Sequence, residues 1–164
     1  MEFSKESREL LTNAGWFEGR SVDVVDVERY LTEVGSHVSN AARSFLSEFH
    51  GIHFKAEYYR VVFDVYKTTR HCGTKEDIKH LESILGEQLC VIGDICYSAL
   101  FMTSSGQVVS CAIDWSYYRI FENYHMMIET YVSNDLHAGK THEIEDSQLP
   151  EWYQDDSDDI AIIK

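Results

Sequence analysis

Proline and glycine are scarce in this 164-residue sequence, which contains one proline and nine glycines. A flexible linker between two domains is usually rich in such residues, so the composition predicts a single domain.

Long apolar runs are also missing. No stretch approaches the roughly 20 apolar residues of a membrane span, and the charged first ten residues lack the apolar core of a signal peptide. We therefore expect a soluble, cytoplasmic protein that has no membrane partner.

Basic residues are in short supply. The chain has 14 Lys and Arg against 28 Asp and Glu, a formal net charge of −14. Non-specific binding to nucleic acid or to an anionic membrane needs a basic surface, so this balance argues against both. It favours a basic protein partner. Residues 135–164 contribute nine of the acids and only two lysines, so we expect a domain over residues 1–136 and an acidic, partly mobile tail over residues 137–164.

The known motifs of catalysis and cofactor binding are absent. There is no G-x-G-x-x-G, no G-x-x-x-x-G-K-[ST], no G-x-S-x-G and no H-E-x-x-H. The four cysteines include no Cys-x-x-Cys pair, and three of them lie in apolar, strand-like runs, which predicts buried free thiols at Cys90, Cys96 and Cys111. The sequence thus predicts no enzyme, no cofactor and no metal site.

Two lone acids, Asp94 and Asp114, keep one enzymatic hypothesis open. Both lie in strand-like segments of low charge. A buried carboxylate can act as a general acid, so a small hydrolase could use the two with a histidine. The alternative, which we favour, is that each acid caps a turn at the end of a strand. Both remain candidates for contacts with a partner.

Helical periodicity opens the chain and returns near its end. Apolar residues recur at helical spacing over residues 3–14, 24–34 and 38–49, and again over residues 121–134. Thr74 and Asp77 resemble a capping box that begins a helix ending at Gly86. Aromatic and β-branched residues predict strands over residues 52–68 and 89–120, with a hairpin turn at Ser104–Gly106. The order predicts an α+β fold, with a mostly antiparallel central sheet against which the N-terminal helices and a C-terminal helix pack.

A cluster of aromatic residues, Trp115, Tyr117 and Tyr118, follows Asp114. Such side chains fill sheet cores, and they are also common in protein interfaces. The sequence leaves both interpretations open.

The stretch that carries the most specific information lies near the start. It reads L-x-x-A-G-W-x-x-G-R from Leu11 to Arg20, and A-x-x-F-L-x-E-F-x-G-I follows at residues 42–52. Later, L-C-V-I-G-D leads through an apolar strand to S-S-G-Q-V. Over residues 8–134 this order resembles the third subfamily of the SUKH superfamily of bacterial immunity proteins.

The resemblance implies an α+β fold and a role in binding and neutralising a polymorphic toxin, often a nuclease, without a cofactor and without a reaction. The functional hypothesis is therefore a toxin inhibitor that is a monomer or weak dimer and whose partner is a basic toxin domain. The alternative is a non-catalytic interaction scaffold or regulator of the same fold.

Trp16 and Arg20 have two interpretations. In the structural one, Gly15 ends the first helix, Trp16 covers the seam between that helix and the sheet, and Arg20 anchors the turn through a carboxylate or helix carbonyls. In the functional one, both are anchors for a partner. The candidate partner-binding residues are then Trp16, Arg20, Asp94, Asp114, Trp115, Tyr117, Tyr118, Asp155, Asp156, Asp158 and Asp159.

Overall fold

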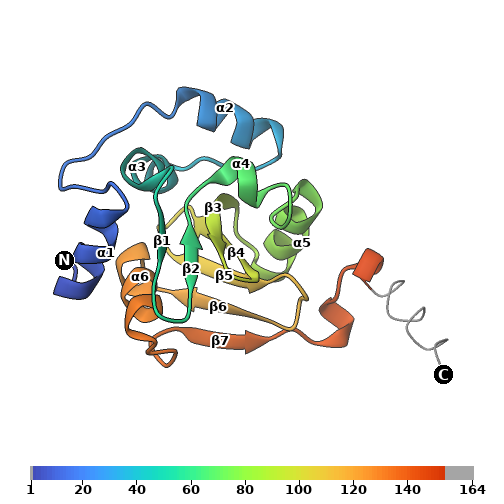
Figure 1. The fold of residues 1–164 in the computed structure, drawn as a ribbon. Helices are drawn as coiled ribbons and strands as arrows, with labels where there is room; N and C mark the ends of the chain where they lie inside the picture. Colours follow the sequence, from blue (N-terminus) through green and yellow to red (C-terminus); the bar gives the residue numbers. More distant parts are fainter. Residues whose placement is uncertain (1, 154–164) are drawn as a thin grey trace, which may run out of the picture.

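The computed structural model describes residues 2–153 of the chain (Figure 1). Its helices are α1 (Lys5–Asn13), α2 (Val25–Glu33), α3 (Asn40–Phe49), α4 (Val65–Thr68), α5 (Lys75–Leu85) and α6 (Tyr124–Ser133), with a 3₁₀ turn, η1 (Asp146–Gln148). Its strands are β1 (His53–Lys55), β2 (Arg60–Val62), β3 (Leu89–Ile95), β4 (Ser98–Thr103), β5 (Val108–Ala112), β6 (Tyr117–Phe121) and β7 (Lys140–Glu143).

Within residues 2–153 the strands form one seven-stranded sheet in the order β1 to β7, and every neighbouring pair is antiparallel. Each strand therefore pairs with the next one along the chain. The predicted turn at Ser104–Gly106 joins β4 to β5, and Gly106 has a φ of +91°. The expected fold class is confirmed: three helices precede the sheet, and α6 packs against it.

The centre of the sheet is covered on both faces. All residues of β4 and β5 are buried. Because successive strand residues point to opposite faces, each face needs its own cover. On one face, the Tyr131 hydroxyl of α6 donates to Ser110 Oγ of β5 (3.2 Å). On the other, Asp77 of α5 lies beside Phe101 and Cys111. Figure 1 shows α6 and α5 on opposite sides of the sheet.

The predicted helix ends are confirmed by their caps. Ser4 Oγ accepts from the amide of Ser7 at the start of α1, and Gly15 after that helix has a φ of +95°. The capping box of Thr74 and Asp77 is present at the start of α5, which ends at Gly86 in the left-handed conformation. Local sequence therefore specifies these boundaries.

Trp16 is buried, with 6% of its surface exposed. Its ring packs edge-on against Phe3 (centroids 5.6 Å apart) and parallel to Phe49 at the end of α3 (6.3 Å). Its Nε1 donates to the carboxylate of Glu48 (3.0 Å). Trp16 thus covers a seam between the start of the chain and α3, where we had expected a seam between the first helix and the sheet.

Arg20 closes the same corner. Its guanidinium donates to the backbone carbonyls of Glu48 and His50 at the end of α3. These carbonyls have no partner within the helix, so an arginine placed there stabilises the helix terminus. The observed contacts match the structural interpretation of the Gly-Trp motif.

The structure also departs from the sequence-based expectations at residues 65–68 and at Cys96. Residues 65–68, which we expected to be extended, form α4, because Asp64 accepts from the amide of Lys67 and so caps a short helix. Cys96 is exposed, whereas we predicted a buried thiol. It lies in the tight turn between β3 and β4 and not within a strand.

The sheet continues beyond residue 136. β7 pairs with β6, and the His142 ring stacks on Tyr118 with the centroids 4.9 Å apart. Trp152 packs edge-on against His80 of α5 (5.7 Å) and Trp115 (6.4 Å). Part of the segment assigned to the acidic tail is therefore docked on the domain.

Replacing Trp16 with alanine should destabilise the fold strongly, because it removes a buried ring and leaves a cavity. We expect a loss of about 3–5 kcal/mol in the free energy of unfolding, measured by guanidinium denaturation. Phe17→Ala is the matched control: Phe17 is 61% exposed, so its loss should cost no more than about 0.5 kcal/mol. Equal losses in the two variants would contradict a structural role for Trp16.

Candidate functional site

The candidate site lies at one end of the sheet. Two neighbouring turns meet there: the turn between β3 and β4, at Cys96 and Tyr97, and the turn between β5 and β6, at residues 113–116. The two are tied together, because the amide of Ile113 donates to the carbonyl of Tyr97 (2.9 Å). The first is also tied to β2, where the carbonyl of Arg60 accepts from the amide of Cys96 (3.1 Å).

Both turns contain a residue in a strained backbone conformation. Cys96 has a φ of +51° and Trp115 a φ of +54°. Left-handed conformations cost a residue with a side chain of the order of 1–3 kcal/mol, and they cluster at functional sites because the surrounding structure must hold them in place. Here Trp115 is buried and packs edge-on against His80 (4.9 Å). Two strained turns at one sheet end mark this end as the candidate site.

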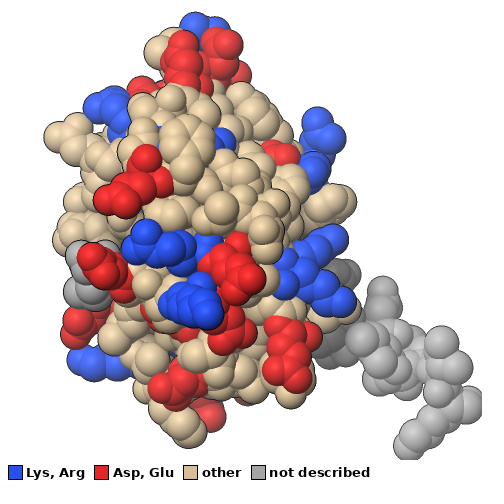
Figure 2. Space-filling model, turned by 60° about the vertical axis from the view of Figure 1, so that its left-hand side comes forward, with Lys and Arg blue, Asp and Glu red and all other residues tan. Residues whose placement is uncertain are grey.

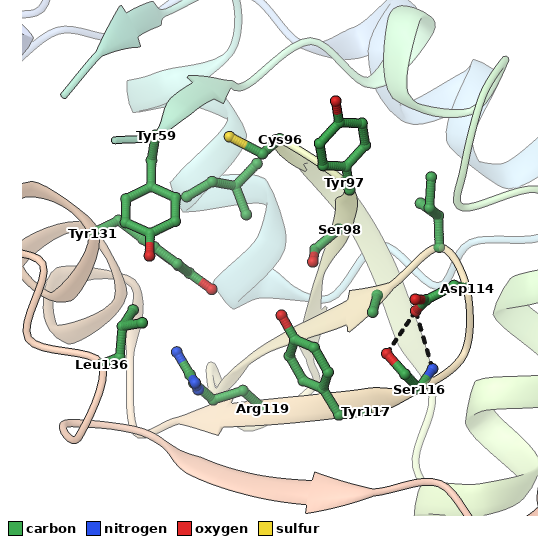
Figure 3. A pocket seen from close by; sticks show the side chains of 13 residues that line it. Tyr59, Cys96, Tyr97, Ser98, Asp114, Ser116, Tyr117, Arg119, Tyr131 and Leu136 are labelled. Atoms are coloured by element: carbon green, nitrogen blue, oxygen red, sulfur yellow. Dashed lines mark hydrogen bonds between the residues drawn. The ribbon is translucent and has the colours of Figure 1, made fainter. Parts of the chain in front are cut away.

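Beside the turns lies a cavity of about 470 Å³, which we call the tyrosine hollow after four residues that line it, Tyr59, Tyr97, Tyr117 and Tyr131. Figure 3 shows the side chains of Tyr59, Tyr117 and Tyr131 directed towards a common space, with Ser98 at its floor and Arg119 at its lower edge. Burial raises the pKa of Tyr131, and its hydroxyl donates to Ser110 Oγ.

The rim of the hollow is unusually apolar for an exposed surface. Tyr97 is 79% exposed, Ile113 48%, Tyr117 37% and Leu136 36%. These are four of the eight large apolar or aromatic residues that are exposed in the part of the chain that the structure describes. Exposed apolar residues that gather around one cavity are typical of a site for a ligand or a protein partner.

Of the sequence-predicted residues, Asp114 and Tyr117 line the hollow. Asp114 caps its turn, as expected, because its carboxylate accepts from the amide (3.1 Å) and the hydroxyl (2.6 Å) of Ser116. Trp115 is buried, and Tyr118 lies on the opposite face of the sheet, next to His142. Trp16 and Arg20 lie at the end of α3. The acids Asp155, Asp156, Asp158 and Asp159 lie outside the described residues.

Asp94 lies in a different hollow, a cavity of about 530 Å³ that is also lined by Arg60, Lys67 and His71. Its carboxylate accepts from the hydroxyl of Thr68 (2.9 Å). Burial raises the pKa of Asp94, while that hydrogen bond and the nearby Arg60 lower it. Asp94 and Asp114 thus line two neighbouring cavities, which share Cys96, Tyr97 and Ile113 in their walls, and the structure does not place both carboxylates in one cavity.

Sequence reasoning missed Tyr59, Tyr97, Ile113 and Arg119. Tyr97 carried a usable signal, since a large aromatic residue between two buried strand patterns has to project from the connecting turn. The other three residues gave no such signal, because only the successive pairing of strands β2, β3, β4, β5 and β6 and the position of α6 bring them to the site.

Charge does not form one continuous patch on the face of the protein that Figure 2 shows. In Figure 2, acidic and basic side chains are interspersed on the face shown, with uncharged surface between them. Within residues 2–153, no group of three or more His, Cys, Asp and Glu is placed to hold a metal ion. None of the described helices has the length and apolar character needed to cross a membrane.

Comparison with known protein families shows to which family the chain belongs. Residues 3–141 match the model of the SUKH-3 immunity protein. The chain belongs to the SUKH-3 immunity protein family. This confirms the resemblance found in the sequence, and the match includes β6 and the first residues of β7. No curated protein and no solved structure matches the chain. Membership supports the role of a toxin inhibitor, whose partner is a cognate toxin protein.

The thiols of this SUKH-3 protein should differ sharply in reactivity. Burial raises the pKa of Cys72, Cys90 and Cys111 to about 12, and only the thiolate reacts rapidly with alkylating agents. Cys96 is exposed at the hollow. At pH 8, iodoacetamide should therefore modify the native protein once, at Cys96, and modify all four cysteines after denaturation. Intact-mass and peptide analysis would show this, and early labelling of Cys90 or Cys111 would contradict it.

Proposed function

We propose that this SUKH-3 immunity protein neutralises a basic nuclease toxin in the cytoplasm by binding it at the tyrosine hollow and the two turns beside it. The protein acts by occupying the toxin, without catalysing a reaction and without a cofactor. The observation that carries the proposal is the apolar rim of the hollow, formed by Tyr97, Ile113, Tyr117 and Leu136.

The residue types at the rim suit a protein interface. Tyrosine is among the residues that contribute most to binding energy, because it buries a large area and loses little side-chain entropy. Tyr97 projects from a turn that backbone hydrogen bonds fix to β2 and to the next turn. Because the backbone of this turn is fixed, Tyr97 loses less backbone freedom on binding than a residue on a mobile loop would, and this increases affinity.

The net charge of −14 supports a basic partner. A nuclease must attract nucleic acid, so its cleft is basic, and an acidic inhibitor is drawn towards it from a distance. Because the charges are interspersed on the face in Figure 2, we attribute this attraction to the total charge and not to one patch. The tail acids Asp155, Asp156, Asp158 and Asp159 contribute to this total, and we propose that they help to bring the toxin in.

The proposal is tested by capturing the toxin and measuring its activity. The tagged protein is incubated with lysate of its own host and washed at low and then moderate salt. We expect a basic toxin domain to stay bound, to degrade nucleic acid when separated, and to lose that activity when one equivalent of the immunity protein is added. A captured toxin with another activity would refute the nuclease assignment, and capture of housekeeping proteins alone would favour the scaffold alternative.

The binding surface is tested with Tyr97→Ser. Removal of an exposed aromatic anchor should weaken toxin binding by about tenfold or more, mostly through faster dissociation, as measured by surface plasmon resonance. Phe17→Ser is the matched control, since Phe17 is also an exposed aromatic residue but lies in the loop between α1 and α2. An unchanged affinity for Tyr97→Ser, or an equal loss for Phe17→Ser, would place the interface elsewhere.

A further inference from the structure

The tyrosine hollow contains an arginine that the protein itself holds in position. Arg119 belongs to β6, and its Nε donates to the hydroxyl of Thr141 on β7 (3.0 Å). Its aliphatic stem passes directly over Gly139. A Cβ at position 139 would lie 2.7 Å from Cγ and Cδ of Arg119 and 2.9 Å from Cε1 of the buried Phe121, which is closer than such atoms can approach. Because glycine has no Cβ, position 139 provides the room that the stem of Arg119 occupies.

The terminal nitrogens of Arg119 have no acceptor among the described residues, and no carboxylate of those residues lies within ion-pair distance of them. Two of the other six arginines form ion pairs with a carboxylate of the described residues. Arg43 contacts Glu28 (2.5 Å), and Arg29 contacts Asp26 (2.9 Å). Asp114 lines the same cavity, but its carboxylate accepts from Ser116 and does not lie within ion-pair distance of Arg119. The orientated guanidinium of Arg119 is therefore available for an outside group.

The surroundings of Arg119 favour an anionic group. The hydroxyls of Tyr59, Tyr117 and Ser98 face the same space (Figure 3), and each can donate a hydrogen bond. A guanidinium presents parallel N–H groups that match the two oxygens of a carboxylate. The cavity of about 470 Å³ is large enough for one or two side chains of a partner, and its apolar rim surrounds the polar floor.

We propose that the tyrosine hollow binds the carboxylate of one Asp or Glu side chain of the toxin, with Arg119 as its partner and Gly139 and Thr141 as positioning residues. This inference rests on the proposed function. The attraction of a basic toxin and the binding of one of its acids are compatible, because the total charge acts at long range whereas the pair forms only at contact. A toxin that has no acid at the matching position would bury Arg119 without a partner for its charge, and this would weaken binding. The ion pair therefore also selects against wrong toxins.

The test measures toxin affinity for Arg119→Gln, Arg119→Lys and Gly139→Ala. Loss of one member of a buried charge pair should weaken binding by about a hundredfold for Arg119→Gln. Arg119→Lys keeps the charge but loses the planar fork, so we expect an intermediate loss. Gly139→Ala displaces the stem without changing the net charge and should also weaken binding. Arg29→Gln is the control for net charge and should change affinity less than about twofold, because an exposed pair contributes little.

Each Asp and Glu of the toxin is then replaced by Asn or Gln and combined with Arg119→Gln. We expect one toxin variant to lose as much affinity for the wild-type protein as Arg119→Gln does, and to lose little more in the double variant. Thermal unfolding of every variant shows whether it is folded. If folded Arg119→Gln and Gly139→Ala bind the toxin as tightly as the wild type, the inference is wrong while the proposed function stands.

If Arg119→Gln weakens binding but no toxin carboxylate is coupled to it, the arginine contacts another kind of acceptor and the inference is also wrong. Absence of toxin binding by the wild type refutes the proposed function itself.

Discussion

The structure depends on the burial of the central strands from both sides. β4 and β5 have no exposed residue, so a single layer of helices would leave half of their apolar side chains in water. A sheet of this kind is stable only when elements from different parts of the chain cover both faces. α5, inserted between β2 and β3, lies on one face, and α6, placed after β6, lies on the other. The polar contact from Tyr131 to Ser110 shows how even a hydroxyl in this centre is satisfied within the protein.

The candidate site is a consequence of where this cover stops. α6 ends at Ser133, and the sheet extends beyond it to the turns at Cys96–Tyr97 and at residues 113–116. At that end the floor of the hollow is sheet, and its rim is made of turns whose backbone is strained at Cys96 and Trp115. Strain can persist there because the residues around it are fixed: Trp115 by its buried ring, and Cys96 by β2. The rigid centre of the fold thus positions the exposed side chains of its end.

Features determined by neighbouring residues could be predicted from the sequence, and features determined by strand pairing could not. The caps at Ser4 and Thr74, the Gly-Trp corner and the order of helices and strands follow from local patterns. α4 was missed because its cap at Asp64 lies within a strand-like composition. The hollow was largely missed because it combines Tyr59, Tyr97, Arg119 and Leu136, which only the sheet register and α6 bring together. Asp94 and Asp114 look alike in the sequence, yet they line different cavities.

In the proposed complex with a basic toxin, charge acts at two ranges, and the charges responsible have opposite signs. The excess of acids extends over the whole chain and is felt by a basic partner before contact, where it changes mainly the rate of association and weakens as salt screens it. Arg119 acts only after contact, inside a cavity where a partner excludes water and where screening by salt is smaller. A toxin that shares the basic character of the cognate one would still be attracted, but it would leave Arg119 buried without a partner unless it carries an acid in the right place. Long-range attraction can therefore be shared among related toxins, while the contact at Arg119 distinguishes one from another.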